Sequence, residues 1–542
     1  MSSTIPITGY LDRFSHRPGE SFTAFVSANR PGPARARLLR VVCADPNPDG
    51  PGMRLEDMSR VFATEFPAEF QPVRLGSYGH APAPRGEGAR TWSVILWMGA
   101  PAEARAVICQ ADETASLVLR AGSAGLEAAL AWPGGSASLS GSTPLAPLAW
   151  HRVWLGADPA TGRLLLGHAP LEGTASVTEG TAPGLVLPSG GTMLFAAENP
   201  DAPCRHFNGK LEAPAILTGC LTDPVATAPL ASWDFAIGIG TQDITDTGPQ
   251  ACHGELANMP TRAVVGSRWS GAEHCWRHAP GDYAAIHFHD DDLDDCRWAP
   301  SFGFTVPEGL KSGAYALHIA NAEGEDWLPL YVLPKREGPF APIAFLASTF
   351  TYQAYANHAR GNIGEAGFRE RIAEWRAYPH SPDEFHAYAH STYNRHPDGS
   401  GVAFTSRLRP VLTMRPGFLT FPDAKGSGLR HYPADSHLLA WLEAKGFAFD
   451  VITDEDLDDE GESILAPYRV VLTGSHPEYH TTGTLDALQA YTQGGGRLVY
   501  LGGNGFYWRI ARDKSRPGIF ELRRAEGGIR AWQAEPGEYY HA

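Results

Sequence analysis

The pattern of apolar residues changes once along this chain, near residue 336, and no single fold class explains both patterns. Before that point, short apolar runs such as TWSVILWM, ASLVLRA and GRLLLGHA are separated by Gly, Pro, Asp and Asn, which predicts β-strands joined by turns. After it, strand-like runs alternate with longer amphipathic runs, which is typical of a parallel sheet covered by helices. A chain of 542 residues has room for about two to four domains.

The β-rich part is predicted to form two sandwiches, one inserted into the other. Its turns recur about every ten residues, a spacing that favours sandwiches. The run WHRVWLGADPATGRLLLGHAP, two strands joined by a D-x-x-T-G turn, resembles a jelly roll of the laminin-G or concanavalin type. We therefore expect this jelly roll at 87–258, with an immunoglobulin-like sandwich in two pieces, 1–86 and 259–336, around it.

The remainder, 337–542, is predicted to be a doubly wound α/β domain. IAFLAS, FAFDVIT, YRVVLTG and RLVYLGG have the composition of buried strands, and TLDALQAYTQGGG that of a helix. A second helix is expected in ADSHLLAWLEAKG, where Asp435 would cap the start and Gly446 would end it. The buried face of this helix is expected to contain Leu438, Leu439 and Leu442.

Composition and charge exclude several function classes. A net charge of −16 argues against a nucleic-acid partner, because phosphate binding needs clustered Lys and Arg. No apolar run is long enough to span a bilayer, and the N-terminus lacks the basic and apolar regions of a signal peptide. The seven cysteines include no C-x-x-C pair, which indicates reduced thiols. A soluble cytoplasmic protein is expected.

Common catalytic motifs are missing from the sequence. It contains no G-x-S-x-G, P-loop or H-E-x-x-H pattern. No cysteine follows Cys296, so the α/β domain cannot be a Cys-His hydrolase of the glutamine-amidotransferase kind, however similar its fold.

Polar side chains follow several of the predicted parallel strands. His476 and Glu478 come directly after the strand YRVVLTG, Asn504 follows another strand, and Tyr352 follows the first. Ligands of such sheets bind at the carboxyl ends of the strands, and an imidazole with a carboxylate suits a first-row transition metal. The competing interpretation is a loop histidine beside a surface glutamate. His480 is either a third ligand or the approach to the next helix, and we favour the helix.

A second group of metal-binding side-chain types lies in HFHDDDLDDCRW (287–298). Two histidines and five aspartates can bind calcium or a transition metal. However, His287 and His289 alternate around Phe288 as residues do on an exposed strand face. We expect a solvated turn between strands here rather than a site.

Two aromatic stretches, STFTYQAYANHARGN (348–362) and HAYAHSTYNRHPDGSG (386–401), lie in the α/β domain. Aromatic residues in loops usually fill the core. A tyrosine phenolate is also a hard anionic ligand for a trivalent metal, so both interpretations stay open on the residues alone.

Taken in order, TYQAYANH, STYNRHPDGSG, TGSHPEYH and LGGNGFYWR resemble the large, catalytic subunit family of N,N-dimethylformamidase, and EGGIRAW and EPGEYYHA add to the likeness. The resemblance implies a glutamine-amidotransferase-like domain that holds a mononuclear iron, Fe(III), with one tyrosine, one histidine and one glutamate. In this sequence the metal ligands correspond to Tyr393, His476 and Glu478.

Further expectations follow from the same resemblance. A second active-site tyrosine corresponds to Tyr352 and a polar asparagine to Asn504, while Tyr388 and Tyr355 are the alternatives for the tyrosine ligand. The implied activity is hydrolysis of a small N-substituted formamide to formate and an amine. An apolar wall around the amide nitrogen is expected from Phe506, Tyr507 and Trp508.

The resemblance also concerns assembly. It implies a small partner subunit and homo-oligomers. Members of the family continue beyond the point where this sequence stops, so we expect either a C-terminally truncated chain or a site completed by another chain.

Other functions remain open from the sequence. The chain could be a carbohydrate-binding protein in which the jelly roll binds the sugar and the α/β domain is non-catalytic. The chain could also be a non-catalytic subunit, or an amidase for another class of amide.

Overall fold

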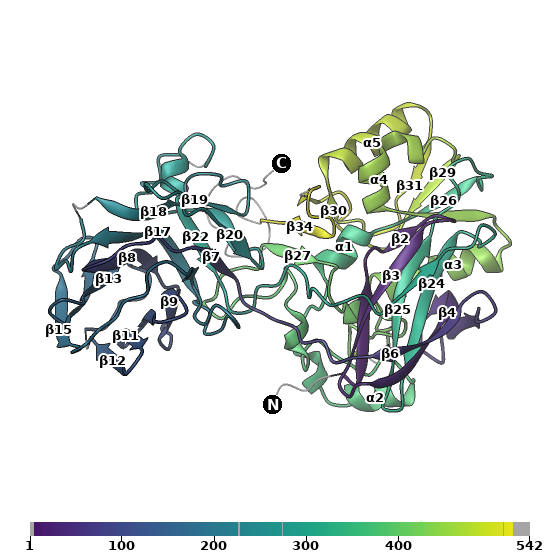
Figure 1. Cartoon of the computed structure of the whole chain (residues 1–542). Coiled ribbons are helices and arrows are strands. Elements are labelled where there is room, and N and C mark those ends of the chain that lie inside the picture. The colour runs from purple at the N-terminus through teal and green to yellow at the C-terminus, as the bar shows by residue number, and fades with distance from the viewer. Residues whose placement is uncertain are drawn as a thin grey trace.

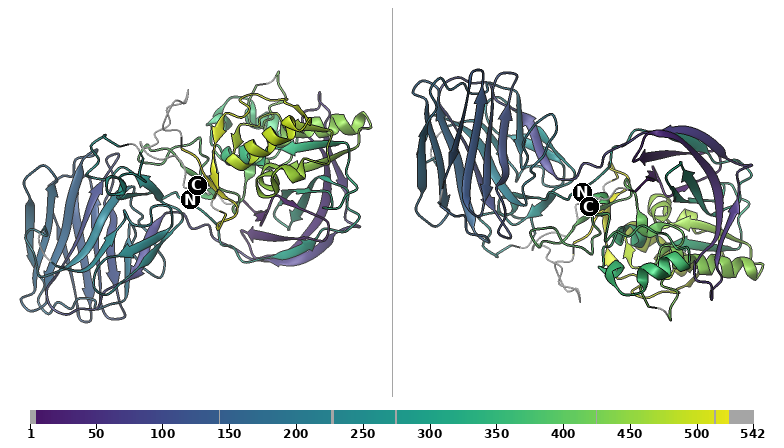
Figure 2. Two further views of the ribbon diagram at one scale, coloured as in Figure 1. Left: turned by 90° about the horizontal axis from the view of Figure 1, so that it is seen from above. Right: turned by 90° about the horizontal axis from the view of Figure 1, so that it is seen from below.

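A computed structural model describes residues 5–523 except residues 142, 226, 227, 274, 424 and 513. Figure 1 shows two lobes. One, here called the β-lobe, is built mainly of strands from the middle of the chain. The other, the mixed lobe, combines strands of the N-terminal part with the helices of the C-terminal part, and Figure 2 shows the same division from above and below. The runs EGGIRAW and EPGEYYHA, at 526–532 and 535–542, lie outside the described residues.

The β-lobe is one connected antiparallel sheet that curls into a nearly closed, jelly-roll-like sandwich. Its sixteen strands are β7 (Tyr78–Pro82), β8 (Arg90–Trp97), β9 (Arg105–Ala111), β10 (Ser116–Gly122), β11 (Gly125–Trp132), β12 (Gly135–Ser140), β13 (Trp150–Asp158), β14 (Arg163–Pro170), β15 (Ser176–Thr181), β16 (Thr192–Phe195), β17 (Gly209–Thr218), β18 (Pro229–Asp234), β19 (Asp243–Asp246), β20 (Gly254–Ala257), β21 (Thr261–Val264) and β22 (Ala285–Phe288). Alternate residues of β8, namely Trp92, Val94 and Leu96, enter its core, as the two-residue period of a strand requires.

The N-terminal strands form a second sandwich, in the mixed lobe, which is antiparallel except for the parallel pair of β2 (Ser15–His16) and β25 (Glu325–Val332). One sheet has the order β1 (Ile7–Leu11), β3 (Ser21–Ala28), β23 (Phe302–Thr305). The other has the order β2, β25, β24 (Gly313–Ala320), β4 (Gly32–Ala44), β5 (Met53–Asp57), with β6 (Ala63–Ala68) also paired to β4. Strands that precede and follow the β-lobe therefore share these sheets. The prediction of a multidomain, mainly β protein is confirmed.

Four parallel strands lie beside this sandwich, in the order β28 (Phe449–Thr453), β26 (Ile343–Ala347), β29 (Val470–Thr473), β31 (Arg497–Val499). The α-helices of the described region are α1 (Thr349–Ala354), α2 (Phe368–Glu374), α3 (Tyr432–Ala444), α4 (Asp454–Glu460) and α5 (Thr482–Gln493). Leucines of α3 pack on one face of the sheet and those of α4 and α5 on the other. The carboxyl ends of β26 and β29, which are neighbours, meet at one edge.

Short elements complete the described chain. They are the strands β27 (Phe404–Ser406), β30 (Tyr479–His480), β32 (Trp508–Arg509), β33 (Ala511–Arg512) and β34 (Ile519–Glu521), and the 3₁₀ turns at Pro280–Tyr283, Asn362–Gly364, His386–Tyr388, Leu412–Met414 and Gly461–Ile464. Among the described residues, no helix combines the length and the apolar content that crossing a bilayer would need.

The sandwich and the parallel sheet share one hydrophobic core. Val41 and Tyr331 of the sandwich belong to the same buried cluster as Phe345, Val451 and Leu439 of the sheet and of α3. The mixed lobe is therefore a single packed body.

The predicted cap of α3 is wrong. The helix begins at Tyr432, three residues before Asp435, with a proline in its first turn, a position that proline favours. Asp435 instead accepts hydrogen bonds from the Ser475 backbone, at 2.6 Å, and from the Tyr352 hydroxyl. The end of the helix agrees with the prediction, since Gly446 follows the last turn with φ of +72°.

Candidate metal and substrate site

Four side chains meet at the carboxyl edge of the parallel sheet. Tyr355 ends α1, which directly follows β26, and His476 and Glu478 lie in the turn after β29. Tyr393 comes from the long segment between α2 and β27. We call these four residues the Glu478 group, because each of the other three contacts the Glu478 carboxylate.

The turn that carries His476 and Glu478 is held by hydrogen bonds from its backbone. The Glu478 N–H donates to the Thr351 hydroxyl of α1 at 3.0 Å, and the Ser475 N–H donates to Asp435. Glycine is required at position 474, because a Cβ there would lie 2.3 Å from the Asp435 carboxylate. The direction of both side chains is therefore set by α1 and α3 together.

Distances within the Glu478 group are those of direct contact. The Tyr355 hydroxyl donates to Glu478 Oε2 at 2.8 Å, and the Tyr393 hydroxyl lies 3.3 Å from Oε1. His476 Nε2 is 3.2 Å from Oε2. Glu478 is only 3% exposed. A phenol, an imidazole and a carboxylate thus converge on one buried point, and these are donor types that a hard transition-metal ion accepts.

The two phenols of the group differ in their surroundings. Their rings stack with centroids 3.9 Å apart. Burial raises the pKa of Tyr355, and the nearby Tyr393 and Glu478 raise it further, so Tyr355 stays a protonated donor. The Tyr393 hydroxyl also contacts the Tyr479 hydroxyl, and it therefore has a partner on either side.

Two residues that the sequence analysis did not single out support the histidine. His431 Nε2 lies 3.2 Å from His476 Nδ1, and the Arg430 guanidinium lies 3.5 Å from the same nitrogen. The Arg430 guanidinium is also 4.2 Å from the Tyr355 ring centroid. Burial lowers the pKa of His431, and the Arg430 charge lowers it further. A neutral His431 beside His476 Nδ1 orients the imidazole so that Nε2 faces Glu478. The order RHYP before a helix carries no signal for this role.

Tyr352 and Asn504 do not join the Glu478 group. The Tyr352 hydroxyl is bound to Asp435, and its ring centroid is 6.4 Å from that of His431. Tyr352 thus contacts Asp435, which holds the turn through the Ser475 N–H, and not the Glu478 carboxylate. Asn504 is exposed, at φ of +51°, on a turn whose neighbour Gly503 bonds to Ser475.

The two alternatives for the tyrosine ligand, Tyr355 and Tyr388, lie in different places. Tyr355 lies in the group, whereas Tyr388 belongs to a different buried cluster with Tyr378 and Leu412.

His480 is buried and its Nε2 contacts the Pro477 carbonyl at 3.0 Å. Burial lowers the pKa of His480 to about 4. It ends β30, two residues before α5 begins, as expected of the approach to a helix.

The expected apolar wall of Phe506, Tyr507 and Trp508 is wrong for its first two members. Phe506 is 39% and Tyr507 44% exposed, and Phe506 stacks on His480. The aromatic pattern of FYW gave no sign of the turn at Asn504, which directs these rings to the surface. Trp508 packs against the buried cluster that contains Tyr355 and Tyr393.

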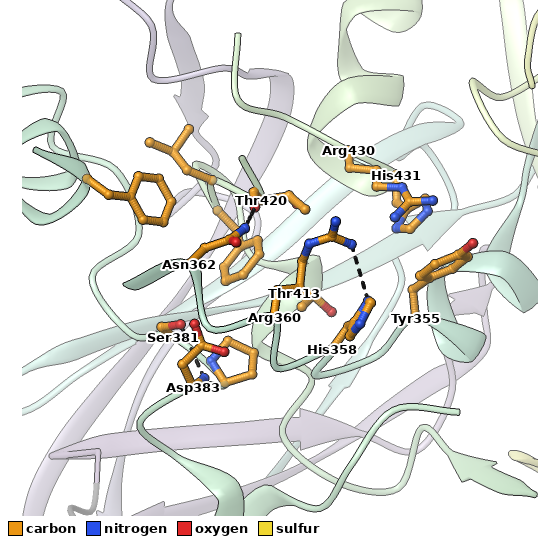
Figure 3. Close-up of a pocket in the computed structure, with 14 residues that line it drawn as sticks. Tyr355, His358, Arg360, Asn362, Ser381, Asp383, Thr413, Thr420, Arg430 and His431 are labelled. Atoms are coloured by element: carbon orange, nitrogen blue, oxygen red, sulfur yellow. Dashed lines mark hydrogen bonds between the residues drawn. The ribbon is translucent and has the colours of Figure 1, made fainter. Parts of the chain in front are cut away.

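A small cavity of about 30 Å³ opens beside Tyr355 and His431. Figure 3 shows these two residues at one end, with Arg360 and His358 along the wall and Ser381 and Asp383 opposite. The remaining wall is formed by Arg430, Asn362, Phe368, Pro382, Thr413, Phe418, Leu419 and Thr420. Because a water molecule occupies about 10–15 Å³ by this measure, the cavity suits a ligand of a few heavy atoms.

The segment 287–298 is not the solvated turn that the sequence predicted. His287 is 3% and His289 1% exposed. Their side chains reach Asp398, and a second group of metal-ligand atoms is formed by His289, Asp292 and His396. The alternation of the two histidines shows that they share a face, but a loop far along the chain covers that face.

Comparisons with known proteins agree along nearly the whole chain. Residues 261–542 match the family model "N,N-dimethylformamidase beta subunit-like, C-terminal". The N,N-dimethylformamidase beta subunit of Paracoccus aminophilus is 35% identical over 592 residues, and that of Alcaligenes sp 36% over 602. Each alignment covers 99% of this chain and 76% of the relative. Proteins with this name are subunits of hydrolases that act on amide C–N bonds.

Solved structures align only loosely. The LG1-3 region of the laminin alpha2 chain aligns with 58% of this chain and 74% of its own, at 9% identity and a TM-score of 0.23. A SAP-like pentraxin from Limulus polyphemus aligns with 28% of this chain and 78% of its own, at 14% identity and a TM-score of 0.21. At such scores neither alignment bears on function.

Proposed function

This chain belongs to the N,N-dimethylformamidase beta subunit family, and from that premise we propose that it hydrolyses a small N-substituted formamide to formate and an amine. The observation that carries the proposal is the Glu478 group: a phenol, an imidazole and a carboxylate in contact, buried, and next to a cavity of small-molecule size.

We propose that Tyr393, His476 and Glu478 hold an iron ion, Fe(III). The donor set fits, because phenolate and carboxylate oxygens suit a hard trivalent ion, whereas zinc more often takes His and Cys sets. When bound, such an ion would polarise the amide carbonyl and acidify a water molecule. Tyr355, whose pKa is raised, would keep its proton and hold Glu478 in place through the 2.8 Å hydrogen bond.

Other residues of the chain have supporting roles in this proposal. His431 would fix the tautomer of His476, and Tyr352 would fix the turn through Asp435. Asn504, predicted as a polar contact for substrate, would act from the surface turn beside Ser475. Arg360 and Arg430 line the cavity and would attract the formate anion, which is the charged product.

We also propose the finer points of fold and assembly. The four-stranded parallel region would be a glutamine-amidotransferase-like domain, and the N-terminal sandwich would be immunoglobulin-like, with the limits predicted from the sequence. The relatives are named as beta subunits, so this chain would assemble with a smaller, different subunit and form homo-oligomers in the cytoplasm.

Iron content and amine release, measured together, test the function. The purified protein, with any subunit that co-purifies, is assayed on a series of N-alkylated formamides. His476→Ala and Glu478→Ala should each lose both iron and turnover, because each removes a ligand. His253→Ala, at an exposed histidine of the β-lobe, is the control and should keep both.

Two results would contradict the proposal in different ways. Iron bound to the wild type without hydrolysis of any formamide would overturn the activity. Full amine release by Glu478→Ala would overturn the site.

A further inference from the structure

A second buried set of metal-ligand side chains lies where the β-lobe contacts the mixed lobe. His287 lies in β22 of the β-lobe, His289 directly follows that strand, and Asp398 comes from the loop that precedes β27 in the mixed lobe. Asp398 Oδ2 is 2.6 Å from His287 Nε2 and 3.7 Å from His289 Nε2. The ligand atoms of all three lie within 4.8 Å of one another.

We infer that His287, His289 and Asp398 form a binding site for a first-row divalent metal ion, most simply zinc, separate from the Glu478 group. Two imidazole nitrogens and one carboxylate oxygen are a donor set that zinc accepts, and calcium or magnesium would prefer oxygens alone. Donors held at 2.0–2.1 Å around a tetrahedral ion stand about 3.3 Å apart, which lies between the two measured separations.

The surroundings of His289 match those of a metal-bound histidine. Its Nδ1 lies 3.2 Å from Asp292 Oδ2, and Asp292 is itself held by the Ser77 hydroxyl at 2.7 Å. A carboxylate at Nδ1 places the proton there and leaves the Nε2 lone pair available to a metal ion. Ser400 Oγ is 3.0 Å from that Nε2.

An alternative grouping of His289, Asp292 and His396 does not converge. The His289 and His396 rings are stacked, with centroids 3.6 Å apart and planes 6° from parallel. Because the nitrogen lone pairs lie in the ring planes, two parallel rings direct them side by side rather than to one point. The His287 and His289 rings are tilted by 41°, so their lone pairs can meet.

Burial favours an ion over bare hydrogen bonds at this place. The side chains of His287, His289 and Asp398 are 4%, 1% and 3% exposed. Carboxylate charges at this depth are costly even when they are hydrogen-bonded, and a divalent ion would offset the charges of Asp398 and of the neighbouring Asp292.

The position of the site indicates what the ion would do. It would join β22 to the loop 394–401, and Asp398 follows the proposed iron ligand Tyr393 by five residues. The ion would therefore hold the β-lobe against the loop that positions Tyr393. Loss of the ion should loosen this loop without removing a ligand of the Glu478 group.

Metal analysis of the full-length protein tests the inference. The protein is stripped with a chelator, equilibrated with Zn²⁺ alone, desalted and analysed for zinc per chain. The His476→Ala background removes uptake by the Glu478 group. In that background one zinc per chain is expected, and addition of Asp398→Asn or His287→Gln should reduce it to near zero. His390→Gln, which changes a neighbour bound to Asp291, is the control and should keep the zinc.

A measurement on His476→Ala alone keeps the inference falsifiable if the further variants do not fold. Its zinc-edge X-ray absorption should show nitrogen and oxygen ligands with imidazole scattering. No zinc uptake by His476→Ala, sulfur in the coordination shell, or full uptake by folded Asp398→Asn would each overturn the site. These results are independent of amide hydrolysis, so failure of the proposed function would leave the second metal site standing.

Discussion

At the scale of single residues, the Glu478 group depends on contacts that reach it from outside. His431 is one of them, because its Nε2 lies 3.2 Å from His476 Nδ1 and it is itself buried. A histidine that binds metal through one nitrogen is usually oriented by a hydrogen bond to the other.

We predict that His431→Gln lowers iron affinity about 10–100-fold, the usual effect of losing such a support, while the protein stays folded. Iron binding is measured by competition with a chelator of known affinity. The control is His437→Gln on helix α3, which directly follows His431; this histidine bonds to Asp45 instead. Equal affinity in wild type and His431→Gln would contradict the role.

The sequence was sufficient for part of this site. His476 and Glu478 could be predicted because parallel strands direct ligands to their carboxyl ends. The two tyrosines could not be separated, since Tyr355 and Tyr393 both reach the carboxylate and only coordinates distinguish their partners. His431 is 45 positions from His476 and lies in no motif, so its role required the fold.

At the scale of elements, the turn after β29 is set by close packing. Gly474 lies against Asp435 of α3, and a Cβ at this position would be 2.3 Å from the carboxylate. Nothing lies within 4 Å of a Cβ built at Gly503 on the neighbouring turn. Substitution of Gly503 is therefore a control for substitution of Gly474, because only the Cβ at position 474 would clash.

We predict that Gly474→Ala destabilises the protein by about 1–3 kcal/mol, the range for overpacking, and lowers iron occupancy because the turn shifts. Gly503→Ala should change the free energy of unfolding by less than about 0.5 kcal/mol. Denaturant unfolding and iron analysis of both variants measure this. Equal free energies of unfolding for the two variants would mean that the turn shifts to accommodate the added Cβ at no measurable cost.

Histidine burial in the β-lobe predicts acid sensitivity of strands β13 and β14. His151 Nδ1 lies 3.0 Å from His168 Nε2 across this pair. Burial lowers the pKa of His168, and the charge of His151 lowers it further. The unfolded chain binds a proton below the ordinary value of about 6.5, whereas folded His168 resists it, so stability should fall as pH drops below that value.

His168→Gln is predicted to weaken this pH dependence between about pH 6.5 and 5. Urea unfolding, followed by tryptophan fluorescence at several pH values, measures it. The same slope in variant and wild type would show that His168 does not contribute.

At the scale of the whole molecule, the first and last parts of the described chain pack together in the mixed lobe, and the middle part forms the β-lobe (Figure 1). Sequence periodicity could predict the mainly β part and its change near residue 336. It could not predict that the sandwich shares a core with the parallel sheet, or that loop 394–401 covers His287 and His289, since both depend on contacts between distant segments.

One buried ion pair joins the sandwich to the C-terminal part of the mixed lobe. Arg415, from the segment before α3, makes two hydrogen bonds of 2.9 Å to Asp326 of β25, and both are buried. Arg415→Ala should reduce the free energy of unfolding by about 3–5 kcal/mol, because it leaves a buried unpaired carboxylate.

The matched control is Glu323→Gln, which breaks the exposed pair with Arg30 and should cost less than about 1 kcal/mol. Guanidinium unfolding compares the two. Similar losses in both would mean that the two parts of the mixed lobe are not held together by the buried pair.

The visible absorption spectrum of the iron-loaded protein shows whether Tyr393 binds the iron, because a tyrosinate bound to Fe(III) gives a charge-transfer colour and a free tyrosine does not. We predict a visible band in the wild type that persists in Tyr355→Phe and disappears in Tyr393→Phe. A band that survives in Tyr393→Phe, or a colourless wild type that holds its iron, would contradict it.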